Sequence, residues 1–323
     1  MSYDPASLPV VTVRFNPRRY QVPEDNFRRF EKHMADSGVP LYVVELALAG
    51  RPFTCTEAGN PRHLQLRSDH IGWWKERLIN LGVQRLLPAD WTKFAWIDAD
   101  VIFERPDWAS ETLYALDHHP ILQPWSQATD RGPQGQHLKQ HAGFGWCWQR
   151  LKRGGDKGVT TTGGSYGGTW HSGYAFAATR RFYDAIGGLP DFMVMGSADR
   201  ELFCACIGEI EKRIVFAPDT SYATMMRILQ ERAMAAGGLN LGYVEGGITH
   251  LYHGPKARRG YGDRFKILQR HRFDPLRDLL TDASGMYRWA PHAAALAAEV
   301  DMQLSARDED NPSLDPVGGS AGS

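Results

Sequence analysis

The sequence has few cysteines, no excess of charge of either sign and no long hydrophobic run, and each absence excludes a class of protein. Its four cysteines among 323 residues are too few for a disulfide framework, and the C-x-C pair at Cys204 and Cys206 does not have zinc-knuckle spacing. The 37 basic and 37 acidic residues cancel, so no global positive field attracts nucleic acid or a membrane surface. No apolar run approaches the ~20 residues of a membrane span. These absences favour buried thiols in a reducing compartment and a soluble protein.

The two ends of the sequence lack the patterns of folded or targeting segments. MSYDPASLPV contains no positively charged stretch followed by an apolar one, so no signal peptide is predicted and we expect a cytoplasmic location. Residues 303–323 are polar and rich in Gly, Ser, Pro and acid, a composition that buries too little apolar surface to order a chain. We therefore predict a single large domain over residues 1–302 and a disordered tail over 303–323.

The first half of the domain alternates between strand-like and helix-like segments. Apolar, β-branched runs predict strands at 9–16, 41–48, 93–97 and from 121, and amphipathic patterns predict helices at 23–37 and from Pro106. Another helix is expected to begin at Ser68 or Asp69, as its cap, and to end at Gly82. Such alternation favours an α/β fold with a mainly parallel central sheet flanked by helices, because parallel neighbours need crossover connections.

The second half is divided by a segment without apolar periodicity. Residues 126–173 include GGDKGVTTTGGSYGG, and a long stretch without a pattern predicts a mobile loop over the site. Helices are predicted near Ser197, over 222–236 and from Pro291. The domain is thus expected to consist of a half at about 9–125, the loop, and a second half at about 174–302.

Two short motifs have the residue types of a metal site. Asp98 and Asp100 follow the apolar strand at 93–97, at the carboxyl end where α/β sheets bind ligands, and paired carboxylates suit a divalent cation such as Mn²⁺ or Mg²⁺. His250 and His253 stand three apart before Gly254, so a backbone turn would bring both to one metal. Either motif alone is also compatible with a solvated turn or with buried histidines that bind no metal.

The combination resembles a known family. WIDADVIF is similar to the D-x-D segment of the GT-A glycosyltransferases, and the later H-x-x-H-G is similar to their C-terminal metal-ligand segment. Between them, the segment from Gly196 to Asp199 resembles an acidic G-x-x-D segment of bacterial and bacteriophage glycosyltransferases. More distantly, RFNPR at 14–18 has the residue types that end the first strand in the β-1,4-galactosyltransferases, in a different order. The match consists of short motifs in the right order over about residues 9–275.

The resemblance implies a GT-A fold and a metal-dependent transfer of a sugar from a nucleotide-sugar, most simply a UDP-sugar, to an acceptor hydroxyl, with inversion. Asp199 would be the catalytic base that takes the acceptor proton, although an acid in the first turn of a helix is also stabilised there by the helix dipole. The implied metal ligands are Asp98, Asp100, His250 and His253. Candidates for nucleotide-sugar binding are Phe15, Asn16, Arg18, Lys75, Arg77, Lys256, Arg258, Tyr261 and Arg264. Candidates for stacking on a sugar are Trp170, His171 and Tyr174, which are equally compatible with the core.

Other functions remain open from the sequence. A phosphohydrolase of the haloacid dehalogenase type also ends a strand in D-x-D, although there the motif closes the first strand, and a non-catalytic sugar- or nucleotide-binding module would share the fold. The acceptor is a saccharide or a hydroxymethylated base in phage-type DNA, because the basic run from Lys256 to Arg272 can follow a phosphate backbone. The same run can serve the donor diphosphate or face solvent.

Overall fold

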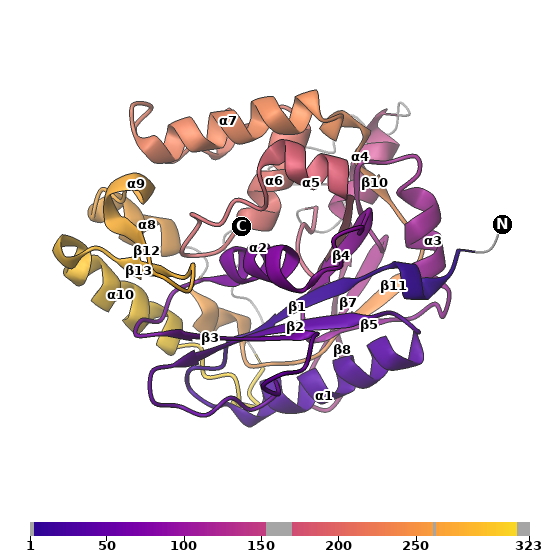
Figure 1. Cartoon of the computed structure of the whole chain (residues 1–323), viewed down its shortest axis with the longest axis horizontal. Coiled ribbons are helices and arrows are strands. Elements are labelled where there is room, and N and C mark those ends of the chain that lie inside the picture. Colours follow the sequence, from indigo (N-terminus) through magenta and orange to yellow (C-terminus); the bar gives the residue numbers. More distant parts are fainter. Residues whose placement is uncertain (1–2, 153–169, 261–262, 315–323) are drawn as a thin grey trace.

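The centre of the molecule is a seven-stranded, mainly parallel sheet (Figure 1). The computed structural model describes residues 3–152, 170–260 and 263–314. The strand order is β10-β6-β9-β4-β1-β2-β3. The four strands β4, β1, β2 and β3 run parallel to one another, and β10 is parallel to β6. Among the described strands, only β9 is antiparallel to its neighbours in this sheet, β4 and β6. The strands are β1 (Val10–Arg14), β2 (Leu41–Leu48), β3 (His63–Ser68), β4 (Lys93–Ile97), β6 (Ile121–Gln123), β9 (Ala175–Thr179) and β10 (Gly242–Tyr243). The predicted α/β class is confirmed.

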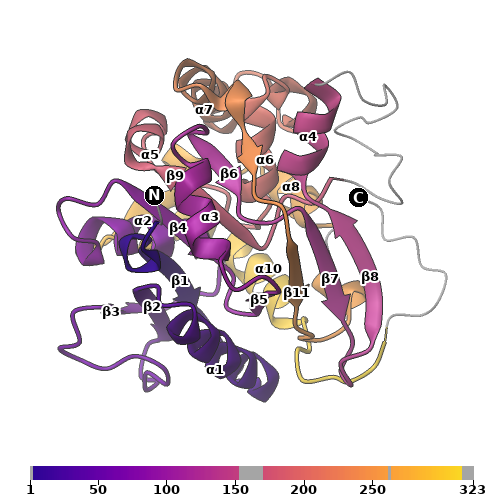
Figure 2. The ribbon, with the colours of Figure 1, turned by 90° about the vertical axis from the view of Figure 1, so that its right-hand side faces the viewer.

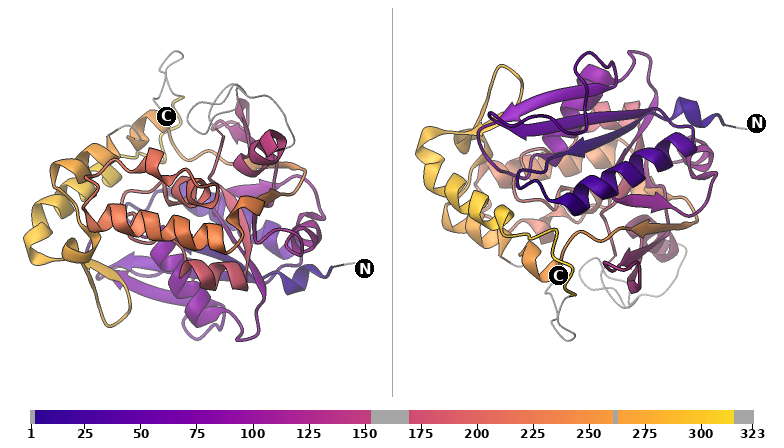
Figure 3. Two further views of the ribbon diagram at one scale, coloured as in Figure 1. Left: turned by 90° about the horizontal axis from the view of Figure 1, so that it is seen from above. Right: turned by 90° about the horizontal axis from the view of Figure 1, so that it is seen from below.

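Helices cover both faces of this sheet, because successive strand residues point to opposite sides. Val11 and Val44 belong to one apolar core, whereas their neighbours Val10 and Val43 belong to the other. Figure 3 shows helices over the sheet in both views, with α7 in front when the molecule is seen from above and α1 in front when it is seen from below. The first face is covered by α2 (Lys75–Leu86), α5 (Arg180–Ile186), α6 (Ala198–Cys206) and α7 (Ser221–Ala235), and the second by α1 (Gln21–Asp36) and α3 (Trp108–Ala115).

A second, four-stranded sheet stands beside the first, with the order β5-β11-β7-β8 (Figure 2). Its strand β5 directly follows β4 in the chain, so the two sheets meet at the D-x-D segment. The strands are β5 (Val101–Phe103), β7 (Gln127–Arg131), β8 (His137–Ala142) and β11 (Gly247–His250). The remaining α-helices and strands of the described residues are α4 (Phe144–Lys152), α8 (Arg264–Arg270), α9 (Pro275–Asp278), α10 (Ala294–Ser305) and the hairpin of β12 (Leu279–Thr281) and β13 (Tyr287–Trp289).

The predicted helix at 68–82 is wrong at both ends. Ser68 closes β3, and α2 begins only at Lys75. Gly82 lies inside α2, where a Cβ atom would stand 2.7 Å from the Val44 side chain. This glycine therefore lets the helix approach the sheet closely and does not end it. Ser197 likewise makes no capping hydrogen bond from its side chain and precedes α6 with φ +74°.

The expected loop at 126–173 is regular in its first part, where β7, β8 and α4 occupy residues 127–152. The strand β8 was missed because it is an edge strand whose first four residues are exposed, so it carries no apolar alternation. Residues 153–169 of that loop lie outside the described residues. The expected disordered tail at 303–323 also differs, since residues 303–305 end α10, and Asp310 and Asn311 make hydrogen bonds to α1 and to the segment after β11. Residues 315–323 lie outside the described part.

The cysteines carry free thiols, three of them buried and Cys55 partly so. Among the described residues, no helix combines the length and the apolarity that crossing a bilayer requires.

Candidate active site

The site lies at the carboxyl edge of the central sheet, where β1 and β4 end. Because β1 and β4 are parallel, Arg14 and Phe15 at the end of one strand and Asp98 at the end of the other reach the same edge. The antiparallel β9 begins there, and the Asp98 N–H donates to the carbonyl of Tyr174 over 2.8 Å. This bond fixes the start of the D-x-D turn before the chain enters β5.

Strand pairing in the second sheet brings the H-x-x-H segment to the D-x-D turn. His250 is paired with Val101 across β5 and β11, and the Leu251 N–H donates to the carbonyl of Asp100 over 2.9 Å. Consequently the His250 Nε2 atom lies 3.6 Å and the His253 Nε2 atom 3.2 Å from Oδ2 of Asp100. Side-chain ligand atoms of these three residues all lie within 4.8 Å of one another.

Each histidine is held by a carboxylate through its other ring nitrogen. The Nδ1 atom of His250 lies 2.9 Å from Oδ1 of Asp130, and the Nδ1 atom of His253 lies 3.2 Å from Oε1 of Glu309. Metal-ligating histidines are usually oriented by such a carboxylate on the second nitrogen. Both Nε2 atoms are thereby directed at Asp100.

The buried charges fit a divalent cation at this cluster. Oδ1 of Asp100 is buried and has no hydrogen-bond partner among the described residues. Burial and the Arg259 guanidinium lower the pKa of His253 to about 4, so its imidazole is neutral at pH 7, as a metal ligand must be. Burial opposes a charge on His250, but Asp100 and Asp130 outweigh it and raise its pKa to about 9, and a cation would replace that proton.

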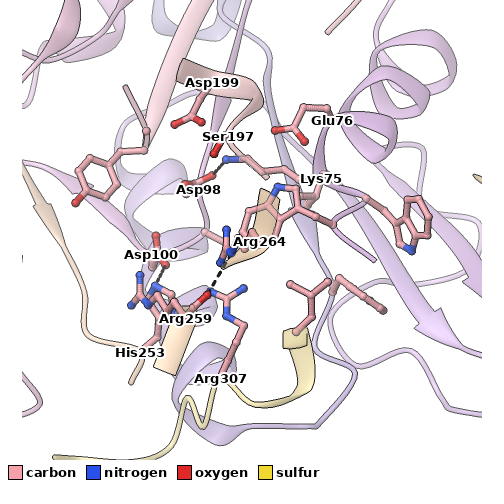
Figure 4. A pocket seen from close by; sticks show the side chains of 18 of the residues that line it. Lys75, Glu76, Asp98, Asp100, Ser197, Asp199, His253, Arg259, Arg264 and Arg307 are labelled. Carbon is pink, nitrogen blue, oxygen red and sulfur yellow. Dashed lines mark hydrogen bonds and ion pairs between the residues drawn. The ribbon is translucent and has the colours of Figure 1, made fainter. Parts of the chain in front are cut away.

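The other aspartate of the motif belongs to a different contact. Asp98 forms an ion pair with Lys75, the first residue of α2. Burial disfavours the charge on Lys75, but the Asp98 carboxylate outweighs it and holds the pKa of Lys75 above its ordinary value. Figure 4 shows Asp98 facing Lys75 and Asp199, while Asp100 faces His253. The Asp199 Oδ2 atom accepts a hydrogen bond from the Ser172 hydroxyl over 3.1 Å.

These groups surround one cavity of about 890 Å³. Although the chain is neutral, ten of its basic side chains gather on the wall of this cavity, whereas five acidic residues line it. The basic residues are Arg14, Arg18, Lys75, Lys139, Arg200, Arg213, Lys256, Arg259, Arg264 and Arg307. The acids are Glu76, Asp98, Asp100, Asp199 and Glu309. A site of this composition suits an anion with several negative charges together with a cation.

Most of the residues predicted from the sequence line this cavity. They are Phe15, Arg18, Lys75, Asp98, Asp100, Trp170, His171, Tyr174, Asp199, His250, His253, Lys256 and Arg264. The three aromatic candidates line the cavity but are also packed in the interior. Trp170 and Tyr174 are only 3% and 6% exposed, and the His171 ring stacks on the Tyr174 ring with 4.0 Å between their centroids. They therefore serve the core in addition to any contact with a ligand.

Three predicted residues are directed elsewhere. The Asn16 amide bonds the Tyr20 carbonyl and the Glu24 carboxylate, which closes the turn before α1. Arg77 faces the opposite side of α2, where it pairs with Asp191 at 3.0 Å. Arg258 is exposed and lies outside the residues that line the cavity. Tyr261 lies outside the described residues.

Several site residues carried no usable signal in the sequence. Asp130 binds His250, His141, Lys256 and the Tyr174 hydroxyl, yet it stands in a strand that was expected to be loop. Glu309 and Arg307 stand in a segment whose composition indicates disorder. Arg14 and Arg259 stand in segments that the sequence did single out, RFNPR and the basic run after Gly254, but only the structure shows that both line the cavity and that Arg258 does not.

Comparison with known proteins gives weak likenesses only. No protein-family model matches the chain, and no curated protein matches it. Among solved structures, the catalytic domain of Drosophila β1,4-galactosyltransferase 7 in complex with xylobiose is 13% identical, with a TM-score of 0.33 over 74% of this chain and 64% of that one, so the match spans less than two thirds of that domain. A mutant of that enzyme in complex with manganese, UDP-Gal and xylobiose gives a TM-score of 0.34 at 13% identity over the same shares. Mannosyl-3-phosphoglycerate synthase from Rubrobacter xylanophilus is 12% identical, with a TM-score of 0.37 over 88% of this chain and 85% of that one. At TM-scores below 0.5 these likenesses assign nothing to the chain, whose fold rests on its own strand order.

Proposed function

We propose that the protein is a metal-dependent glycosyltransferase of GT-A type, which transfers a sugar from a nucleoside-diphosphate sugar to an acceptor hydroxyl with inversion. The observation that carries the proposal is the convergence of Asp100, His250 and His253 beside Asp98 in a cavity rich in basic side chains. A nucleoside diphosphate is a multiply charged anion that needs both a cation and basic groups. The Asp100–His250–His253 cluster would hold the cation, and the cavity wall beside it carries the basic groups.

The cation would be Mn²⁺ or Mg²⁺, held by Asp100, His250 and His253. When bound, it would offset the charge that develops on the diphosphate leaving group. Lys75, Lys256, Arg259 and Arg264 on the wall add fixed positive charge against the same phosphates. Asp98 would hold Lys75 in place and contact the donor ribose or the metal.

Asp199 is the proposed base. It lines the cavity on the side where Asp98 and Lys75 lie, and the Ser172 hydroxyl fixes one of its carboxylate oxygens. A carboxylate there would accept the proton of the acceptor hydroxyl as its oxygen attacks the anomeric carbon, which gives inversion. Trp170, His171 and Tyr174 form the adjacent wall for a sugar ring.

The nucleotide base would lie at the end of β1, against Phe15 and Arg18. Asn16 is not part of this proposal because its amide is used in the turn before α1. A UDP-sugar is the donor that the resemblance to the galactosyltransferases implies. The nucleotide is therefore the first variable to test.

A saccharide acceptor is favoured over a hydroxymethylated base in DNA. The basic run that suggested DNA is divided in space: Lys256, Arg259 and Arg264 line the cavity, whereas Lys266 pairs with Asp263 outside it. Three of the seven basic residues in the run thus face the proposed donor site. A steep loss of activity with added salt would support DNA as the acceptor, because phosphate contacts release counterions, and indifference to salt would support a saccharide.

The proposal is tested by thermal shift with UDP-, GDP- and CMP-sugars, with and without Mn²⁺. A ligand at 100 times its dissociation constant stabilises the folded state by about 2.7 kcal/mol, so one donor is expected to raise the melting temperature only when the metal is present. Asp100→Asn is expected to abolish this shift, and Asp36→Asn, an exposed acid paired with Lys32 on α1, is the matched control.

The outcomes separate the alternatives. A metal-dependent shift without hydrolysis or transfer would indicate a non-catalytic binding module. No shift with any donor, together with phosphate release from an aryl phosphate, would replace the proposal by a phosphohydrolase of the haloacid dehalogenase type. The wild type must respond and Asp100→Asn must not for the glycosyltransferase proposal to stand.

A further inference from the structure

The segment after α10, residues 306–314, returns across the molecule to the start of α1. The Asp310 carboxylate accepts hydrogen bonds from the backbone N–H groups of Gln21 and Val22, over 2.9 and 2.7 Å. These are the first two N–H groups of α1, which have no partner within the helix. An acid at this position is also stabilised by the helix dipole. The segment thus caps a helix 288 or more residues away in the sequence.

The same segment is fastened to the loop that follows β11. The Tyr252 hydroxyl donates to the carbonyl of Asn311 over 2.9 Å, and the Asp308 N–H donates to the hydroxyl of Tyr20 over 3.2 Å. Asn311 in turn donates from its amide to the Asp308 carboxylate over 2.7 Å, which closes a local turn. Polar contacts therefore fix residues 308–311 although the segment has little apolar surface.

The glycine of the H-x-x-H-G motif makes room for this segment. Gly254 has φ +86°, and a Cβ atom on it would stand 2.7 Å from the Asp308 carbonyl oxygen and 2.8 Å from Cα of Glu309. Neither distance is possible for a real side chain against backbone. The close approach of the segment therefore depends on Gly254, directly after the metal-ligand candidate His253.

Two side chains of the segment reach the cavity. Glu309 accepts from Nδ1 of His253 over 3.2 Å and pairs with Arg307 at 3.0 Å, and both are largely buried. The Arg307 guanidinium also lies over the indole of Trp73, 5.3 Å from the ring centroid. Figure 4 shows Arg307 directed at the cavity from the side opposite Asp98.

We propose that residues 306–314 form a strap that completes the active site, in which Glu309 is a positioning residue that holds the Nε2 atom of His253 toward Asp100. This inference rests on the proposed function, because it gives Glu309 a role in metal binding. It goes beyond it because the strap belongs to neither motif from which the function was inferred. Removing the contact leaves the imidazole free to rotate, so the cation is bound more weakly.

The test is a Mn²⁺ titration of the full-length protein, followed by the electron paramagnetic resonance signal of the free ion. Glu309→Ala is expected to weaken Mn²⁺ binding by about 10- to 100-fold, the usual effect of losing a partner of a ligating histidine. Glu309→Gln keeps an acceptor for Nδ1 and is expected to bind more tightly than Glu309→Ala. Glu299→Ala is the matched control, since Glu299 also contacts an imidazole, that of His271 at 2.7 Å, outside the cavity.

A merely structural role is separated by two further measurements on the metal-free protein. Glu309→Ala is expected to keep its melting temperature within a few degrees of the wild type. Hydrogen exchange at the N–H groups of Gln21 and Val22 is expected to be slow in the wild type and faster in Asp310→Ala. Fast exchange in the wild type would overturn the strap itself.

The failure of this inference differs from that of the proposed function. If the wild type binds Mn²⁺, Asp100→Asn does not and Glu309→Ala binds as the wild type does, the positioning role of Glu309 is overturned and the proposed function stands. If the wild type and Asp100→Asn are equally unable to bind Mn²⁺, the metal site falls and the role of Glu309 falls with it.

Discussion

Replacing Gly254 by alanine should harm the protein more than replacing another glycine with the same backbone conformation. Gly254 and Gly59 have φ values of +86° and +83°, but a Cβ atom at Gly59 would meet nothing within 4 Å. A left-handed backbone costs an L-residue about 1–2 kcal/mol, which applies to both variants. Only Gly254→Ala also forces the backbone of Asp308 and Glu309 away, and overpacking of this kind costs about 1–3 kcal/mol more. The difference between the two variants therefore isolates the contact with the strap.

Urea unfolding measures this difference directly. We expect Gly254→Ala to lose about 1–3 kcal/mol more unfolding free energy than Gly59→Ala, and to bind Mn²⁺ more weakly because Glu309 moves away from His253. If the strap of Gly254→Ala detaches from the domain instead of remaining bound under strain, the extra loss of unfolding free energy cannot exceed the stability that the strap contributes. The weakened binding of Mn²⁺ is then the larger effect. Equal stability losses in the two variants together with unchanged Mn²⁺ affinity would refute the reasoning.

Two further predictions concern buried charges. Arg213 pairs with Glu201 at 2.9 Å, and the Glu201 side chain is only 1% exposed, so Arg213→Met should cost about 3–5 kcal/mol of unfolding free energy, and Arg213→Met with Glu201→Leu should recover most of it in the same urea experiment. Burial alone would raise the pKa of Glu45, but hydrogen bonds from the Thr56 hydroxyl and the Thr54 N–H outweigh it and lower that pKa. The contribution of Glu45 to stability is therefore complete above its unfolded-state pKa of about 4.3 and is lost as the pH falls through its lower pKa in the folded state. Between these two pKa values the unfolding free energy of the wild type should fall more than that of Glu45→Gln. An equal fall in both proteins would contradict the prediction.

The central sheet could be predicted from the sequence because burial on both faces leaves a clear pattern. The segments 41–48 and 93–97 consist almost entirely of apolar residues, and both are strands with these bounds. The strand β3 at the edge of the sheet was missed because four of the six residues in its HLQLRS sequence are polar. The strand β8 was missed for the same reason. These two edge strands contain too few apolar residues to give a pattern long enough for a prediction.

The candidate site was predictable where the residue type and the strand end coincide. Asp98 and Asp100 satisfy both conditions, and the structure places them on the cavity wall. Their different contacts were not predictable, because nothing in the sequence shows that Asp98 pairs with Lys75 while Asp100 faces the histidines. A backbone hydrogen bond from Asp98 N–H to the carbonyl of Tyr174 holds this turn, and the two carboxylates leave it toward different partners.

The convergence of the histidines depends on the register between β5 and β11. His250 ends β11 opposite Val101, and its Nε2 atom lies 3.6 Å from the carboxylate of Asp100, which directly precedes β5. A shift of one residue would turn His250 to the other face of this sheet, because side chains alternate along a strand. His253 reaches the carboxylate of Asp100 because the chain turns after β11. At this turn the backbone of the strap packs directly against Gly254, which has no side chain. The H-x-x-H-G motif thus supplies two of the three candidate metal ligands. They converge on Asp100 because β5 pairs with β11 and because the strap holds His253.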